Sequence, residues 1–113
     1  VAAISALGDQ IQKSDDPRAQ IRVFKALDDI SPEVRAEAVT LIGKSCDAED
    51  VEHMLCRKLT DEDNQVRKNT AMALMKLEAY NSVESIERAK STEEDDTVQA
   101  VFNVAINILS RDL

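Results

Sequence analysis

The sequence predicts an all-α solenoid, a superhelix of about three and a half helix pairs stacked along one axis. Apolar residues recur with helical spacing, and the pattern itself repeats every 32 residues, as in stacked arrays. The chain has only two glycines, two prolines and three aromatic residues, a composition that argues against β-sandwiches and barrels. Its 113 residues make one small domain, which excludes a multidomain enzyme.

Charge and hydropathy exclude two classes of partner. The 22 acidic and 14 basic residues leave a net charge of −8, which repels a nucleic-acid backbone. No apolar run reaches the length of a membrane span, and the amino terminus lacks the layout of a signal peptide. We therefore expect a soluble, cytoplasmic protein that binds neither nucleic acid nor membrane. Because Val1 begins inside an apolar pattern, we expect residues 1–113 to be a single repeat domain cut from a longer protein.

Each repeat begins at a valine and continues with the same helical face. The valines and the apolar residues eight positions later are Val34 and Ile42, Val66 and Leu74, and Val98 and Ile106. A second, shorter amphipathic stretch precedes each valine, so that each unit is predicted to be a pair of helices.

The first four helices follow from local start signals. Residues 1–13 look like the remains of one helix, and residues 17–28 like its partner. Ser31 supplies an N-cap and Pro32 a first-turn proline for a helix over residues 32–45. Asp47 caps a helix predicted over residues 48–59.

Three further helices complete the predicted array of seven. Asp61 or Asp63 opens a helix over residues 63–79, and Asn81 or Ser82 opens a short one over residues 82–90. The acidic residues 93–96 precede a last helix that ends near residue 111, since carboxylates are favoured at a helix N-terminus.

One segment carries a resemblance to a known family. Residues 60–77, TDEDNQVRKNTAMALMKL, combine an acidic turn, a Val-Arg pair, small residues and a final Leu. This pattern resembles the HEAT-like repeat of the phycobilisome-lyase type over residues 15–109. The resemblance implies a structural ladder of ion pairs between units, for which the candidates are Asp29 with Arg35 and Asp63 with Arg67. Gln99 replaces the arginine in the third unit, which we interpret as the end of the ladder.

The resemblance also implies a binding surface. In such solenoids the second helices of successive units line a concave face that binds a partner. The corresponding residues are Arg22, Lys25, His53, Arg57, Glu84 and Arg88. Their mixed charge favours a protein partner over a polyanion.

The last predicted helix has more apolar surface than one buried face requires. Val98, Phe102, Ala105 and Leu109 share one stripe, and Val101, Val104 and Ile108 form a second stripe beside it. The second stripe is a candidate interface for a further helix, for a partner or for a second copy in a homodimer. Alternatively, the preceding short helix covers it.

Catalytic and metal signals are scarce. His53 is the only histidine, which excludes motifs that need two imidazoles, and Glu52-His53 occurs once where iron hydroxylases with HEAT-like repeats carry repeated His-Glu pairs. Cys46 and Cys56 lack CxxC spacing and are predicted to be free, buried thiols, although Cys56 lies one turn from His53 and a reactive pair is conceivable. We therefore predict no catalytic, cofactor-binding or metal-binding residues.

The favoured hypothesis is a non-catalytic scaffold, not an enzyme, that binds a protein partner of unknown identity on its concave face or through its last helix. The alternative is a subunit of a bilin lyase-like enzyme that acts on a tetrapyrrole-carrying protein. The three scattered aromatic residues, Phe24, Tyr80 and Phe102, argue against an aromatic-lined tetrapyrrole cleft.

Overall fold

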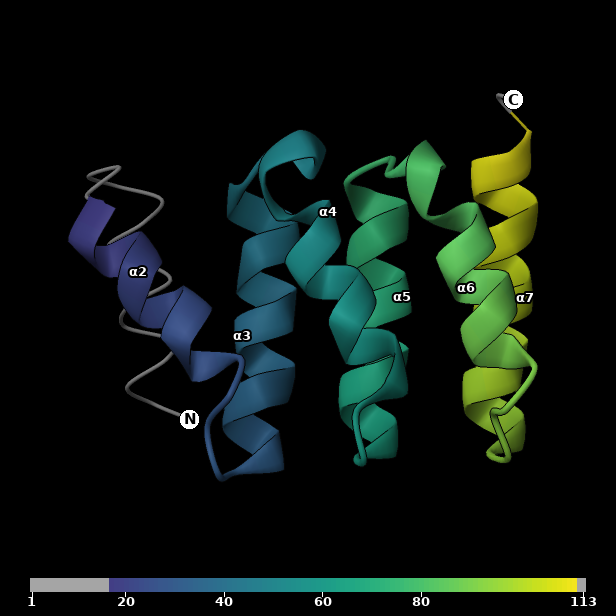
Figure 1. The fold of residues 1–113 in the computed structure, drawn as a ribbon, viewed down its shortest axis with the longest axis horizontal. Helices are drawn as coiled ribbons and strands as arrows, with labels where there is room; N and C mark the ends of the chain where they lie inside the picture. Colours follow the sequence, from purple (N-terminus) through teal and green to yellow (C-terminus); the bar gives the residue numbers. More distant parts are fainter. Residues whose placement is uncertain (1–16, 112–113) are drawn as a thin grey trace.

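A computed structural model describes residues 17–111. Over this range the chain forms six α-helices and two short 3-10 helices (Figure 1). They are α2 (Pro17–Ala26), α3 (Pro32–Ser45), α4 (Ala48–Cys56), η1 (Arg57–Thr60), α5 (Asn64–Lys76), η2 (Tyr80–Ser82), α6 (Val83–Lys90) and α7 (Asp96–Ser110). The described part contains no strand, and the prediction of an all-α solenoid is confirmed. The helix expected over residues 1–13 lies outside the described residues.

Local signals explain where the helices begin. The Ser31 hydroxyl accepts a hydrogen bond from the backbone N–H of Val34, which makes it the N-cap of α3. Asp63, rather than Asp61, caps α5, and its carboxylate lies 3.1 Å from the N–H of Val66. Asp47 precedes α4 as predicted, but its side chain makes no capping hydrogen bond.

The helices form two layers. Figure 1 shows α3, α5 and α7 side by side in one layer, with α4 and α6 of the second layer in front of them and α2 at the left, beside α3. The core lies between the layers, where Val39, Leu74, Ile86 and Phe102 are completely buried. A single helix pair could not bury this much apolar surface, so each unit depends on its neighbours.

Successive first-layer helices approach closely at one point. A Cβ atom added to Gly43 of α3 would lie 2.8 Å from the Cβ of Ala73 in α5. Only a glycine allows this contact without a shift of the helices. The equivalent position in α5 holds Met75, which packs against the core.

A three-residue turn recurs before each first-layer helix. In each turn an acidic residue accepts the backbone N–H of the residue two positions later, and that residue's side chain caps the helix. The acids and caps are Asp29 with Ser31, Asp61 with Asp63, and Glu93 with Asp95. The turns recur every 32 residues, and in each unit the residue three positions after the cap is a valine whose backbone N–H the cap accepts.

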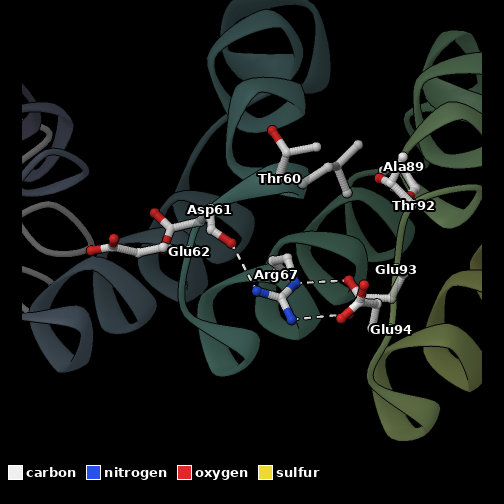
Figure 2. Close-up of a pocket in the computed structure, with 9 residues that line it drawn as sticks. Thr60, Asp61, Glu62, Arg67, Ala89, Thr92, Glu93 and Glu94 are labelled. Atoms are coloured by element: carbon white, nitrogen blue, oxygen red, sulfur yellow. Dashed lines mark hydrogen bonds and ion pairs between the residues drawn. The ribbon is translucent and has the colours of Figure 1, made fainter.

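An arginine ladder joins the turns, with partners other than those expected. The guanidinium of Arg35 donates two hydrogen bonds, each of 3.1 Å, to the carboxylate of Asp61. Arg67 donates to Glu93 at 2.7 and 2.9 Å (Figure 2). Each arginine therefore pairs with the acidic residue in the turn of the following unit. Hydrogen bonding to Asp61 raises the pKa of Arg35, which shows that this pair favours the charged guanidinium.

The predicted ion pairs of Asp29 with Arg35 and of Asp63 with Arg67 are wrong. Asp29 contacts Arg35 through its backbone carbonyl, at 2.8 Å, and the Asp63 carboxylate is used as the N-cap of α5. Arg67 makes the equivalent backbone contact with the carbonyl of Asp61, at 2.9 Å (Figure 2). The carbonyl of each turn thus holds the arginine of its own unit, while the carboxylate holds the arginine of the unit before.

Gln99 occupies the arginine position of the third unit. Its amide donates to the carbonyl of Glu93 at 2.9 Å, which is the same bond to its own turn that Arg35 and Arg67 make. A neutral amide cannot make the ion pair that the arginines add. Gln99 therefore makes the hydrogen bond to its own turn but not the ion pair to a following turn.

Candidate functional site

A groove runs between α4 and η1 on one side and α6 on the other. It encloses about 470 Å³, which lies within the range of small-molecule sites. The lining residues are His53, Cys56, Arg57, Leu59, Thr60, Ser85, Arg88, Ala89 and Thr92. The groove belongs to the second layer of helices, which Figure 1 shows in front.

Helical spacing places the polar side chains along the two walls. His53 and Arg57 lie four residues apart, one turn along continuous α4 and η1, and so share a side. Ser85 and Arg88 lie three residues apart on α6 and face the same groove. Leu55 is completely buried on the opposite side of α4, which fixes the orientation of that wall.

The floor of the groove is apolar and its rim is polar. Leu59 and Ala89 are buried, with 1% and 5% of their surfaces exposed. Cys56 is half-buried, and its thiol donates to the hydroxyl of Ser82 across 3.4 Å. The site therefore offers an amphipathic ligand a small apolar surface flanked by hydroxyl groups and cations.

The two arginines of the groove are exposed and weakly engaged. Arg88 lies 3.2 Å from Glu84 one turn earlier, and both side chains are more than 70% exposed. Exposed pairs of this kind contribute about 0.2–1 kcal/mol or less. Arg57 forms no ion pair with any residue between 17 and 111, although its charge helps to lower the pKa of Asp28. In a chain with a net charge of −8, these are cations that an anionic ligand can use.

The structure brings together half of the predicted concave face. His53, Arg57 and Arg88 line the groove, and Glu84 borders it through its pair with Arg88. Arg22 and Lys25 are exposed on α2 and do not line it. Partner binding by these six residues stays a prediction.

Three polar groove residues escaped the sequence analysis, whereas Cys56 was noted there for its place one turn from His53. The three are Thr60, Ser85 and Thr92. Thr60 and Thr92 lie 32 residues apart and are therefore equivalent in successive units, a signal that the repeat already contained. Ser85 precedes Arg88 by one turn, which also could have indicated a shared face.

The second apolar stripe of the last helix is divided. Val101 is half-buried and packs against the core, whereas Val104 and Ile108 are 49% and 43% exposed. Thus the fold covers one of the three residues, and an interface through the other two stays a prediction.

A second cavity, of about 290 Å³, lies beside the groove at the ladder (Figure 2). The guanidinium of Arg67 points toward the carboxylate of Glu93, which occupies it, and Asp61, Glu62 and Glu94 add negative charge. This cavity therefore has no cation to offer an anionic ligand.

Other chemistry finds little support in the described residues. They contain no group of three histidine, cysteine or acidic residues that could hold a metal ion. Burial raises the pKa of the Cys46 thiol, and the nearby Asp50 and Asp47 carboxylates raise it further, which makes this thiol a poor nucleophile. Between residues 17 and 111, no helix combines the length and apolar character needed to cross a membrane.

Comparison with known proteins identifies similar chains. The family model for HEAT repeats matches residues 22–107. The "Bilin biosynthesis protein MpeU" of Synechococcus sp. (strain WH8020) is 44% identical over 111 residues. The match covers 98% of this chain but only 37% of that protein, so the chain spans little more than a third of its relative's length.

This relative corrects two expectations from the sequence. The hypothesis of a non-catalytic scaffold and the exclusion of an enzyme are both contradicted, because nearly the whole chain matches a protein named for bilin biosynthesis. The scarcity of aromatic residues, which favoured the scaffold hypothesis, does not separate this chain from its bilin-related relative. The bilin-related alternative is the one that the comparison favours.

Proposed function

The chain belongs to the HEAT-repeat family, and we propose that it forms part of a bilin lyase-like enzyme acting on a tetrapyrrole-carrying protein. The observation that carries the proposal is the 44% identity to a bilin biosynthesis protein over 98% of the chain. The chain spans 37% of that relative's length, and its proposed contribution to the activity is a helical surface that holds the bilin.

The groove between α4 and α6 supports this role. An open-chain tetrapyrrole is amphipathic, with apolar ring faces, polar nitrogens and carboxylate side chains. Leu59 and Ala89 provide an apolar floor, and Arg57 and Arg88 provide positive charge at the walls. The arrangement suits the binding and orienting of a bilin. Holding the bilin in a fixed geometry accelerates its transfer to an acceptor.

The test is a transfer assay. The chain is incubated with a free bilin and a carrier protein that has an unmodified acceptor cysteine, and covalent bilin on the carrier is measured by fluorescence after denaturing electrophoresis. We expect labelling to be faster, or more specific for one product, with the chain than without it.

A matched control uses the carrier with its acceptor cysteine replaced by serine, which should remain unlabelled. A carrier labelled at the same rate and with the same product, whether or not the chain is present, contradicts the proposal.

A further inference from the structure

The groove contains two exposed arginine side chains that the fold engages only weakly, Arg88 through its pair with Glu84 and Arg57 through the field of Asp28. Arg57 reaches it from the start of η1, and Arg88 from the last turn of α6. In the neighbouring cavity, by contrast, the charge of Arg67 is taken by Glu93. Among the two cavities of this region, only the groove therefore has guanidinium groups available for an external anion.

We propose that this groove binds the edge of a bilin that carries its two propionate groups, with Arg57 and Arg88 as the partners of the two carboxylates. The inference rests on the proposed function, since it names the part of the bilin that the site recognises. Both propionates of a free bilin are ionised at neutral pH. Guanidinium groups match carboxylates with two parallel hydrogen bonds, a geometry that a lysine cannot provide.

The competing partner of Arg88 is easily displaced. Its pair with Glu84 is a single 3.2 Å contact between exposed side chains, which water already screens. A propionate resting on the floor formed by Leu59 and Ala89 is partly shielded from water, so its pair with the arginine is the stronger one. The displaced Glu84 carboxylate is 84% exposed and is therefore stabilised by water.

The remaining groove residues suit the rest of the ligand. The hydroxyls of Thr60, Ser85 and Thr92 can donate to lactam oxygens or accept from pyrrole nitrogens. The volume of about 470 Å³ suits part of a tetrapyrrole, with the remainder open to solvent or to other parts of the enzyme.

The test compares biliverdin with its dimethyl ester, which has the same tetrapyrrole but no charged propionates. Binding to the chain is followed by the absorbance change on titration, for wild type, Arg57→Gln, Arg88→Gln and the double variant. We expect each single substitution to weaken biliverdin binding about tenfold, and the ester to bind wild type at least tenfold more weakly than biliverdin. The double variant should bind the two ligands equally.

Arg111→Gln, at the exposed carboxyl end of α7 and outside the groove, is the matched control and should bind biliverdin as wild type does. Thermal melts establish that the variants are folded, which we expect because both groove arginines are exposed. If wild type binds biliverdin and its ester equally well, or if the double variant still discriminates between them, the propionate assignment is overturned while the proposed function stands. If neither ligand binds wild type, both fail.

Discussion

Two pairs of arginines occupy two regions of the molecule. Arg35 and Arg67 lie in the ladder that joins successive turns, where their side chains are only 8% and 18% exposed and are held by carboxylates and carbonyls. Arg57 and Arg88 line the groove, where one has no ion pair among residues 17–111 and the other has a single exposed one. The same residue type is therefore structural in one region and available to a ligand in the other.

The difference follows from what faces each side chain. In the ladder, the turn of the next unit presents an acidic residue at a fixed distance, so each charge is neutralised by the fold itself. In the groove, Arg88 has only the exposed pair with Glu84, and Arg57 acts on the exposed carboxylate of Asp28, whose pKa it helps to lower, without forming an ion pair with it. Burial with full hydrogen bonding marks a structural charge, whereas exposure beside an apolar floor marks one that can bind.

The largest expected effect comes from removing a ladder arginine. Arg35→Ala leaves the nearly buried carboxylate of Asp61 without its main partner, and should lower the free energy of unfolding by about 3 kcal/mol. Arg57→Ala, in the groove, should change it by less than about 0.5 kcal/mol. Urea denaturation followed by circular dichroism measures both.

Arg35→Lys provides a second variant in case Arg35→Ala does not fold. It keeps the charge but loses the paired hydrogen bonds, so its stability should lie between those of wild type and Arg35→Ala. Equal urea-denaturation midpoints for the Arg35 and Arg57 variants would contradict the distinction between structural arginines in the ladder and available arginines in the groove.

Adding a methyl group where α3 contacts α5 should lower the free energy of unfolding by less than the loss of a ladder arginine. Gly43→Ala places a methyl group 2.8 Å from the Cβ of Ala73, and should cost about 1–2 kcal/mol despite the better helix propensity of alanine. Adding Ala73→Gly should recover part of the loss, because the clash is removed. A double-mutant cycle on unfolding free energies measures this coupling, and simple additivity would show that the helices do not touch there.

Removing an N-cap side chain should destabilise the protein more in a turn of the ladder than in the turn before α4. Asp63→Ala deletes the side chain that accepts the N–H of Val66 at 3.1 Å, and should cost about 1 kcal/mol. Asp47→Ala removes an acid at the start of α4 that makes no capping bond, so only a few tenths of a kcal/mol should be lost. Thermal melts of the two variants rank them, and a reversed order would contradict the observed caps.

The smallest effect concerns acid pH. Hydrogen bonds from the backbone of Val98 and from the side chain of Asn64 hold the pKa of Asp95 below its ordinary value of 3.8. A carboxyl with a lowered folded pKa stabilises the fold above its unfolded pKa, and this contribution is lost as the pH falls through the folded value. Stability should therefore fall below about pH 4, and Asp95→Asn, which keeps a capping group, should reduce that dependence in denaturation curves taken across the acid range.

Much of the architecture was predictable because helix signals are local. Ser31 and Pro32 predicted the start of α3, and the 32-residue period predicted the pairing of helices into units. The end of α4 was misplaced because the tightening into η1 after Cys56 depends on packing that spacing does not record. His53 and Arg57 were correctly assigned to one side of a helix, but nothing local indicated that Arg88 faces them.

The sequence by itself determined the all-α solenoid, the repeat length and the order of the helices, because caps and periodicity act within one or two turns of the chain. Only the tertiary structure decided which charged side chains are paired within the fold. The sequence paired Arg35 and Arg67 with acids of their own units, whereas the stacked units place each guanidinium against the turn that follows, 26 residues later. The partners of a long charged side chain depend on how one unit is placed on the next. That placement is set by contacts such as Gly43 against Ala73, which no local pattern encodes.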